Sequence, residues 1–494
     1  MDARLTRRRF LGAAAAGATA VALLPRAALA RYVDPGPRQI DLRGFGVVAD
    51  GRTDDGPALA RAFASAPRGD LTLLVPGTLL VGAPVIVPDG VSLDLGGSTV
   101  LKAAGLNAPA LLVRGNGVAI GRLVVDGNRR GGAHGPGVEW QGTGGRLFDA
   151  TIRNTDVAGV VARVVGADVE CTRVACLDHV SGVKSGDGFY AALGGKLRLG
   201  YGCSGSGNDR AGVYLESSAA PGCAVNGSFD RNGVVGTYLK SPAGTSDSLS
   251  LNANERFGLI MKQAATGWRF GTVSVQGGGS GTSVTGIELY GSTGNSFRSI
   301  VVRGVTGYGL ALAGGDLGGP GASGNTFTSI NCDATGAPDS DPAVLLAGGA
   351  KRNAFGRLVV RAHTAALSFG EGYLPLDNDG NTFALVRAQA CAYSVLVLRG
   401  GSGNRFDRIE SVGCGTVDPA IAQGLIVFGA TATQDNTVGY LDVTADPAGR
   451  LAPPLYLVVA EGAARDNRVL AGRRGPSRLG VELDASGANP VALS

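Results

Sequence analysis

Five short segments of this sequence share one pattern, and this repeat constrains the possible folds more than any other feature. Each segment contains a glycine followed by residues that alternate between two classes of side chain; the segments are 156–163, 187–192, 209–216, 233–240 and 255–262. Their glycines recur every 22 to 29 residues, a spacing that is too short for a separate domain and suits one turn of a solenoid. We therefore expect a stack of parallel β-strands, one from each turn.

The alternation predicts which side chains face the core and which face outward, because successive residues of a strand point to opposite sides. The residues expected inside are Val213, Leu215, Leu239, Leu259, Met261, Ile287 and Leu289. The opposite positions hold Tyr190, Tyr214 and Tyr238, and then Arg163, Glu216, Lys240 and Lys262. With the strands stacked in register about 4.8 Å apart, these residues would form a tyrosine column beside a charged column on the outer face.

A second repeat covers the later part of the chain. An asparagine followed two residues later by Phe or Val recurs every 23 to 32 residues, at Asn295, Asn325, Asn353, Asn381, Asn404, Asn436 and Asn467. Asparagine tolerates left-handed turns, and its amide can bond to the amide of the next turn. The two repeats predict about a dozen turns of a parallel β-helix over residues 111–470, preceded by a cap and first turns (31–110) and followed by a cap or tail (471–494).

The composition agrees with an all-β solenoid. The chain has 82 glycines among 494 residues, and only 6% of its residues are aromatic. No Gly-X-Y period or proline-rich tract runs through it, so collagen and disorder are poor interpretations. Glycine at the corners of many short strands explains the content better.

The first 30 residues predict an export signal. Arg7-Arg8-Arg9-Phe10-Leu11 resembles the twin-arginine signal, and an apolar run and the small-residue site Ala28-Leu29-Ala30 follow it. We expect export by the twin-arginine machinery to the periplasm or the cell exterior. Five of the 45 basic residues and one of the 40 acidic residues lie in this segment. The remaining chain is nearly neutral, which argues against nucleic-acid binding and against a membrane association after signal removal.

The seven cysteines predict buried, unpaired thiols rather than a metal site. They are Cys171, Cys176, Cys203, Cys223, Cys332, Cys391 and Cys414, an odd number without any Cys-x-x-Cys pair. Several fall in strand-like stretches, where a free thiol behaves as a small apolar side chain. If any two are bonded, Cys203 and Cys223, one turn apart, are the first candidates.

The stretch after the signal resembles a known family. Residues 41–62 read Asp-Leu-Arg-Gly-Phe-Gly-Val-Val-Ala-Asp-Gly-Arg-Thr-Asp-Asp-Gly-Pro-Ala-Leu-Ala-Arg-Ala, and residues 91–96 and 125–128 continue the match. This pattern resembles the opening of the pectate-lyase-like superfamily, in its rhamnogalacturonase and epimerase branch. The resemblance implies a right-handed parallel β-helix whose N-terminal end this segment caps. It also implies acidic polysaccharides as ligands and leaves Ca²⁺ open as a cofactor.

The same stretch predicts a short capping helix from its residues alone. Thr53, with Asp54 and Asp55 after it, can cap a helix and meet its positive end, and apolar residues four apart follow on one face. Asp50, Asp54 and Asp55 also suit an acidic metal site. We favour capping as the role of these carboxylates.

The outer columns suggest chemistry at C5 of a uronic acid, by β-elimination or epimerisation. This chemistry needs a base, a cation for the enolate-like carboxylate and often an acid for the leaving oxygen. The candidate catalytic residues are Tyr190, Tyr214, Tyr238 and Lys240, and the candidate substrate-binding residues are Arg163, Arg210, Glu216, Lys262, Glu288 and Tyr290. A lysine beside a tyrosine is expected to lower the pKa of the phenol. The alternative is that the columns only stabilise adjacent strands.

Inverting glycoside hydrolysis of the rhamnogalacturonase type is the second hypothesis. It requires two carboxyl groups about 6.5–9.5 Å apart. Asp156 and Asp209 occupy the same position in turns that are two apart, and Asp187 lies near the turn between them. The polygalacturonase pattern is incomplete, because no second Asp follows Asp187 and no Gly-His-Gly occurs. Turn aspartates that cap backbone amides are the alternative role.

A third hypothesis is a polysaccharide-binding or structural β-helix without catalysis. The chain has only Trp140 and Trp268 as tryptophans, a small supply of flat stacking surfaces for sugars, which argues mildly against a pure binder. Its three histidines are dispersed, and His179, ahead of Asp187, is the one that merits a test.

Overall fold

A computed structural model of the chain describes residues 39–491, apart from 67, 183–184, 279–283, 316–318, 336, 338–339, 371–376, 416–423, 430–432, 446–452, 462–463, 474, 476, 478–479 and 485–488. Residues 1–30, where the sequence predicts an export signal, lie outside the described residues. Asp41–Ser494 forms one compact unit. In the described ranges, no helix is long and apolar enough to cross a membrane.

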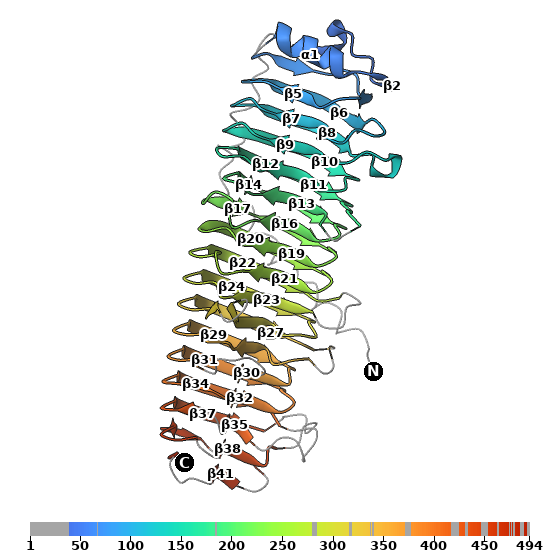
Figure 1. Ribbon diagram of the computed structural model, residues 1–494. Helices are drawn as coiled ribbons and strands as arrows, with labels where there is room; N and C mark the ends of the chain where they lie inside the picture. Colours follow the sequence, from blue (N-terminus) through green and yellow to red (C-terminus); the bar gives the residue numbers. More distant parts are fainter. Residues whose placement is uncertain are drawn as a thin grey trace, which may run out of the picture. The chain divides into compact units, whose positions relative to one another are not determined.

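Two long parallel sheets, called sheet A and sheet B, make up this unit (Figure 1). The strands of sheet A are β2 (Asp50–Asp54), β3 (Asp70–Thr72), β4 (Thr78–Val81), β6 (Ser92–Lys102), β8 (Ala119–Asp126), β10 (Gly145–Arg153), β12 (Asp168–Leu177), β14 (Lys196–Leu199), β15 (Ser204–Ser206), β17 (Cys223–Val225), β18 (Gly227–Asp230), β20 (Gly244–Asn252), β22 (Arg269–Gln276), β24 (Ser296–Arg303), β27 (Thr326–Asp333), β29 (Ala354–Arg361), β31 (Thr382–Gln389), β34 (Arg405–Val412), β37 (Thr437–Thr444), β39 (Arg468–Val469) and β40 (Gly472–Arg473).

Sheet B holds the strands that carry the predicted site. They are β5 (Val85–Val87), β7 (Leu111–Val113), β9 (Val138–Trp140), β11 (Ala158–Ala162), β13 (Asp187–Ala191), β16 (Ala211–Leu215), β19 (Val235–Leu239), β21 (Phe257–Met261), β23 (Thr285–Tyr290), β25 (Leu310–Gly315), β28 (Val344–Leu346), β30 (Ala365–Phe369), β32 (Ser394–Leu398), β35 (Gly424–Phe428), β38 (Tyr456–Ala460) and β41 (Gly480–Asp484). The remaining elements are β1 (Gln39–Asp41), η2 (Leu42–Phe45), α1 (Gly56–Ser65), η3 (Arg129–Gly131), β26 (Gly319–Gly321), β33 (Gly401–Ser402) and β36 (Thr433–Gln434).

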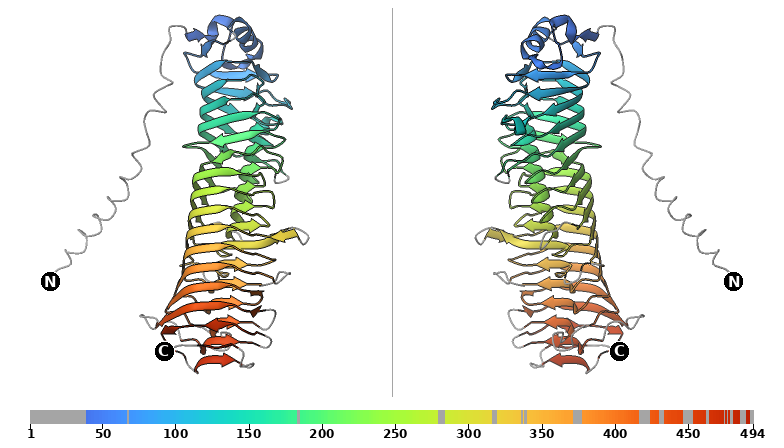
Figure 2. Two further views of the ribbon diagram at one scale, coloured as in Figure 1. Left: turned by 90° about the vertical axis from the view of Figure 1, so that its left-hand side faces the viewer. Right: turned by 90° about the vertical axis from the view of Figure 1, so that its right-hand side faces the viewer.

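The predicted all-β, right-handed parallel β-helix with a short N-terminal helix is confirmed. Each strand of sheet B pairs in parallel with the strand one turn later, from β5 through to β41. There are about 15 turns, somewhat more than the sequence repeats indicate, because turns also form before the first aligned segment and after the last. β25 and β26 form an antiparallel hairpin that projects from the stacked turns in Figure 2 (yellow).

The helix α1 packs on the N-terminal end of the stack, where it contacts η2, β4 and β5. Its buried face consists of Ala58, Leu59, Ala62 and Phe63. Asp54, not Thr53, accepts a hydrogen bond from the first helical amide, that of Gly56, at 3.0 Å. Thr53 itself belongs to β2, so the predicted cap is shifted by one residue.

The predicted register of the aligned segments is confirmed. Tyr190 pairs with Tyr214, and Tyr214 pairs with Tyr238. The residues predicted inside are fully buried: Val213, Leu215, Leu239, Leu259, Met261, Ile287 and Leu289. The glycines of the segments also stack, and an added Cβ at Gly188, Gly212 or Gly258 would lie within 2.8 Å of the carbonyl oxygen of the glycine one turn later. In these turns a side chain in that column would therefore press on the backbone of the next turn, whereas later turns hold Ala343, Ala366 and Val395 at the same position.

The asparagine repeat forms a continuous ladder inside the structure. The side-chain amide of Asn295 donates to Asn325, and the same bond recurs from turn to turn through Asn353, Asn381, Asn404, Asn436, Asn467 and Asn489 at 2.8–3.0 Å. The phenylalanines two residues after these asparagines stack on one another from Phe297 to Phe406, with ring centroids 4.3–5.2 Å apart, and Phe270, two residues after Trp268, extends the stack by one turn. A shorter ladder joins Asn208, Asn232 and Asn254. These buried contacts fix the register of every turn that they join.

All seven cysteines are buried free thiols, as predicted. Cys203 and Cys223 are not bonded to each other. The sulfur of Cys203 faces the carbonyl oxygen of Cys171, and that of Cys223 faces the carbonyl oxygen of Ala220. The disulfide that the sequence suggested for these two residues is therefore absent.

We predict that Asn353→Ala destabilises the protein strongly. The amide of Asn353 donates to Asn381 and to the carbonyl of Ala322, and its oxygen accepts from Asn325. Its removal leaves several buried groups unsatisfied, at about 1–3 kcal/mol each. The urea midpoint measures the effect. Asn107→Ala is the matched control, because Asn107 is exposed and its loss should change stability by less than about 0.5 kcal/mol. Equal midpoints for the two variants would contradict a structural role of the ladder.

Candidate functional site

The tyrosine column predicted from the sequence forms on the outer face of β13, β16 and β19. Ring centroids lie 5.7 Å apart between Tyr190 and Tyr214 and 4.9 Å apart between Tyr214 and Tyr238. The middle ring, Tyr214, is only 4% exposed, although it points away from the solenoid core. It is covered by its outer-face neighbours Tyr190, Tyr238 and Ile260. The column is therefore a packed aromatic strip with half-buried rings at both ends.

Two cations lie over the middle of this strip. The guanidinium carbon of Arg210 is 4.2 Å from the ring centre of Tyr214. The ammonium of Lys240 is 5.3 Å from the ring centre of Tyr214 and 5.2 Å from that of Tyr238. Cations are attracted to aromatic faces at these distances. Glu216 completes the group, because its carboxylate is hydrogen-bonded to the Tyr214 hydroxyl and lies 3.9 Å from the Lys240 ammonium.

Asp187 anchors Arg210 from below the outer face. The Asp187 side chain is 2% exposed, and both of its oxygens accept from Arg210, one from Nε at 2.9 Å and the other from Nη2. The register explains this contact, because Asp187 pairs with Ala211 at the start of β16, next to Arg210. Asp187 was a candidate catalytic residue, but the guanidinium covers its carboxylate and separates it from solvent.

Glu139 is a member of the site that the sequence analysis missed. It lies in register with Val161 and Tyr190 on the outer face, it is 6% exposed, and it binds Nη2 of Arg163 at 2.8 Å. The signal was present in the sequence: Gly137-Val-Glu-Trp-Gln141 is a glycine followed by an alternating pattern, 22 residues before Gly159. The outer face therefore carries two arginines, Arg163 and Arg210, each held by a buried carboxylate.

The pKa values of the tyrosines contradict the expectation that neighbouring cations favour phenolate. Burial and the Glu216 carboxylate raise the pKa of Tyr190, although Arg210 and Arg163 act in the opposite direction. Burial and the hydrogen bond to Glu216 raise the pKa of Tyr214 still further. Desolvation of the phenolate outweighs the cations, so both hydroxyls are protonated at neutral pH. They can donate protons or hydrogen bonds but cannot act as bases in this state.

The face changes character at its C-terminal end. The ammonium of Lys262 lies 3.7 Å from the ring centre of Tyr290, and Glu288 follows Ile260 in the outer column. One turn later the equivalent positions hold Ala311 and Ala313, and Ala311 packs in an apolar cluster with Leu345. We define the tyrosine face as the outward residues of β9–β23, between Glu139 and Tyr290.

Asp156 and Asp209 lie at equivalent positions before β11 and β16, but each is engaged in a loop. Asp156 accepts from the Gly135 amide at 2.6 Å and lies 2.7 Å from Nδ1 of His134. Asp209 accepts from the amide and hydroxyl of Ser181 at 2.9 and 3.0 Å. Both carboxylates therefore cap backbone amides, which was the alternative role for these turn aspartates, and the contacts give no support to a hydrolytic pair at these positions.

His179 is buried within the core near the same loops. Its Nδ1 lies 2.7 Å from the Thr155 hydroxyl, and burial lowers its pKa to about 3. The backbone amide of His179 donates to Asn208, so the histidine continues the short asparagine ladder. It is therefore neutral at physiological pH and links the neighbouring turns.

The carboxylates near the N-terminus also bind backbone rather than each other. Asp55 is fully buried and accepts from the amides of Val48 and Ala49, and Asp50 accepts from those of Arg52 and Thr53. Within the described residues, no three His, Cys, Asp or Glu side chains gather to hold a metal ion. Because Asp50 and Asp55 already bind backbone amides, they do not fit a Ca²⁺ site.

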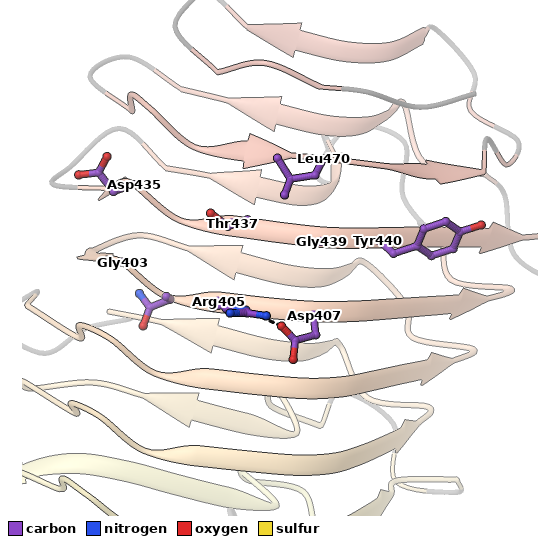
Figure 3. A pocket seen from close by; sticks show the side chains of 9 residues that line it. Gly403, Arg405, Asp407, Asp435, Thr437, Gly439, Tyr440 and Leu470 are labelled. Carbon is purple, nitrogen blue, oxygen red and sulfur yellow. Dashed lines mark hydrogen bonds and ion pairs between the residues drawn. The ribbon is translucent and has the colours of Figure 1, made fainter.

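A separate shallow cavity of about 760 Å³ lies over β34 and β37 of sheet A. Figure 3 shows side chains from three successive turns around it, including the ion pair of Arg405 and Asp407, Tyr440 and the exposed Leu470. Arg405 and Asp407 are 2.5 Å apart and neutralise each other. This surface lacks the stacked tyrosines and the anchored arginines of the tyrosine face.

Comparisons with known proteins give likenesses of fold. No protein-family model matches the sequence, and no curated protein matches it significantly. Among solved structures, the chain is similar to the tailspike protein of E. coli bacteriophage HK620 in complex with a pentasaccharide, with 12% identity, a TM-score of 0.45, and coverage of 92% of this chain and 78% of that one. It is also similar to the A-module of the Azotobacter vinelandii mannuronan C-5 epimerase AlgE6, with 12% identity, a TM-score of 0.25, and coverage of 92% and 99%. At these identities and TM-scores, neither likeness carries information about the reaction of this chain.

Proposed function

We propose that this protein binds an acidic polysaccharide along the tyrosine face and acts on its uronic acid residues, by β-elimination or by epimerisation at C5. The observation that carries the proposal is the aromatic strip of Tyr190, Tyr214 and Tyr238 with Arg210, Lys240 and Glu216 packed around it. No other surface among the described residues combines stacked rings with both cations and carboxylates.

The geometry suits a polymer better than a small molecule. The strands of sheet B lie about 4.8 Å apart, close to the length of one sugar residue, so successive turns can meet successive sugars. Tyrosine rings offer apolar faces to the C–H surfaces of sugars, and their hydroxyls offer hydrogen bonds. The cations Arg163, Arg210, Lys240 and Lys262 are distributed over β11–β21, which favours a ligand with repeated negative charges.

The roles of the side chains follow from their protonation. A cation must stabilise the charge that develops on the uronate carboxylate once the C5 proton leaves, and Arg210 is held in place for this task. The protonated Tyr190 is the candidate acid. The Glu216 carboxylate, about 30% exposed, is the candidate base, and the Lys240 ammonium, 3.9 Å from it, is a second cation that can stabilise the developing negative charge. Tyr214 is buried and holds Glu216, so it is a positioning residue.

Polysaccharide binding without turnover is the second candidate function. The observation in its favour is that the pKa values of Tyr190 and Tyr214 are raised, which removes the phenolate base from the mechanism. Inverting hydrolysis at Asp156 and Asp209 remains a weaker proposal, because both carboxylates already hold loops.

The first prediction concerns the reaction on a panel of polyuronides. Elimination would give an unsaturated product that absorbs in the ultraviolet, and epimerisation in D₂O would exchange H5, which proton NMR detects. New reducing ends without the absorbance would instead indicate hydrolysis. Binding without any of these signals would support the non-catalytic alternative, and the absence of binding to every polyuronide would contradict the proposal.

The second prediction concerns single side chains. We expect Tyr190→Phe, Glu216→Gln and Lys240→Gln to keep the fold, because partly exposed sites usually change stability by under about 0.5 kcal/mol. Loss of the proton-transfer groups Tyr190 and Glu216, or of the positive charge of Lys240, should lower turnover by about 10²–10⁴-fold. Tyr440→Phe is the matched control, since Tyr440 lines the cavity over sheet A. Wild-type turnover in the first three variants, or its loss in the control, would move the site away from the tyrosine face.

A further inference from the structure

Arg210 is held in place by contacts of both its backbone and its side chain. Its backbone amide donates to the carbonyl of Gly186 on one neighbouring turn, and its carbonyl accepts from Val234 and Val235 on the other. Its guanidinium is fixed by Asp187 through two hydrogen bonds and by the Tyr214 ring at 4.2 Å. A guanidinium that is already ordered loses little entropy when it binds an anion.

One nitrogen of this guanidinium makes no hydrogen bond to the described residues. Asp187 accepts hydrogen bonds from Nε and Nη2, whereas Nη1 has no acceptor among them. The side chain is 27% exposed, so these N–H groups can reach a ligand on the tyrosine face. Arginine presents its donors in a planar fork that matches carboxylate and other oxyanions.

We propose that Arg210 is the residue of the tyrosine face that binds the anionic group of the ligand. Buried Asp187 is its positioning residue, and the protonation state of Asp187 sets the net charge of the pair. The proposal rests on the proposed function for the identity of the ligand, an acidic oligosaccharide. It deepens that function by naming the group that selects negative charge and the pH range in which the selection weakens.

The surroundings of Asp187 explain how its proton is controlled. Arg210 and Asp209 face it from the segment before β16, Tyr190 lies on its own strand, and on the β11 side it pairs with uncharged Ala158. Burial raises the pKa of Asp187 to about 7, although Arg210 lowers it, and Asp209 raises it slightly further. The carboxyl is therefore neutral below about pH 7, where Arg210 keeps its full positive charge, and ionised above it, where the pair is neutral.

The affinity for an anionic ligand should fall as pH rises through 7. Below this pH Asp187 is neutral and the positive charge of Arg210 attracts the ligand, whereas above it the Asp187 carboxylate cancels that charge. One unit charge at contact distance in water is worth about 1 kcal/mol, so the expected loss is roughly five-fold between pH 5.5 and pH 8.5. The carboxylates of a uronate oligomer are ionised across this range and contribute no change of their own.

Calorimetric titration of a uronic-acid hexasaccharide tests the proposal. Asp187→Asn cannot ionise, so we expect it to bind at every pH as the wild type does at pH 5.5. Arg210→Gln should weaken binding about ten-fold at every pH. Asp168→Asn is the matched control, because Asp168 forms an ion pair with Arg198 on sheet A, and it should keep the wild-type pH dependence. A pH dependence that survives in Asp187→Asn, or wild-type affinity in Arg210→Gln, would overturn the proposal.

A second measurement separates this proposal from the proposed function. The folded pKa of Asp187 lies above the value of 3.8 for a free carboxyl, so the stability that it contributes is complete below pH 3.8 and is lost as pH rises through 7. Wild-type stability should therefore fall relative to Asp187→Asn between pH 4.5 and pH 8. If the hexasaccharide binds no variant, the proposed function fails while this comparison still reports on Asp187. Parallel stability curves would overturn the role of its proton.

A different observation supports a second, independent inference. Gln389 pairs with Val412, so Cys391 and Cys414, each two residues further on, occupy the same position of adjacent turns. The amide of Gly415 donates to the carbonyl of Cys391 at 3.2 Å, which holds the two segments together, and each thiol faces the carbonyl oxygen two residues before it, that of Gln389 and that of Val412. Cα atoms of neighbouring strands lie about 4.8 Å apart, which is within the range of about 4.4–6.8 Å that a disulfide requires.

We infer that Cys391 and Cys414 form a disulfide when the protein meets a peroxide. Contact with Cys391 lowers the pKa of Cys414, whereas the pKa values of Cys171, Cys203 and Cys332 are raised by burial. The Cys414 thiolate attacks one peroxide oxygen and becomes a sulfenic acid, while the other oxygen leaves as water after protonation. The Cys391 thiol then displaces the second water, and two thiols and one peroxide give one disulfide and two waters.

Peptide mapping after treatment with hydrogen peroxide tests this inference. We expect one cross-link between Cys391 and Cys414, and five thiols should still react with a thiol reagent after denaturation. Cys391→Ser should remove the cross-link, and Cys223→Ser should not. Seven remaining thiols, or a cross-link between another pair, would overturn the assignment.

Discussion

The parallel, in-register pairing of successive turns is the constraint on which the rest of this structure depends. Backbone hydrogen bonds alone allow neighbouring strands to slip, and a slip by one residue would exchange the two faces of a strand. The asparagine ladder and the stacked phenylalanines prevent this, because each buried amide from Asn295 to Asn489 bonds to the amide of the next turn. Once the register is fixed, residues at one position of the repeat must form a column, and the chemistry of the outer face follows.

Within that frame, the tyrosine face is built by pairing exposed cations with buried carboxylates. Glu139 and Asp187 are among the few buried acidic residues of the described chain, and each binds an arginine that reaches the surface. The free energy that a buried carboxylate loses on desolvation can exceed the gain from its ion pair, so these residues are expected to add little to stability. Their effect is to fix the position of each guanidinium. The same face contains Lys240 and Lys262 over tyrosine rings.

Much of the fold could be predicted from the sequence, because the same pattern of inward, outward and corner residues recurs in successive turns of a solenoid. The alternation placed Val213 inside and Tyr214 outside correctly, and the asparagine spacing identified the ladder. The site was harder to predict, since its electrostatics depend on burial that no single turn reveals. The burial of Tyr214 comes from rings one turn away on both sides, and this is why its phenol pKa rises instead of falling. The partner of Asp187 lies one turn later, outside any local pattern, and Glu139 belongs to a turn whose resemblance to the others is weaker.

The glycine column beside the inner residues has a consequence for how such a protein can change. At Gly188, Gly212 and Gly258 a Cβ in this column would meet the backbone of the next turn, and the distance between turns is set by the backbone hydrogen bonds of the paired strands and not by the residues on the outer face. Substitutions at the outward positions of β9–β23 therefore leave the spacing of the turns unaltered. The outward residue already differs between adjacent turns of the same scaffold, as at Glu288 and Ala311. Within a single strand, the outward residues can therefore change the ligand preference while the inward residues keep the fold.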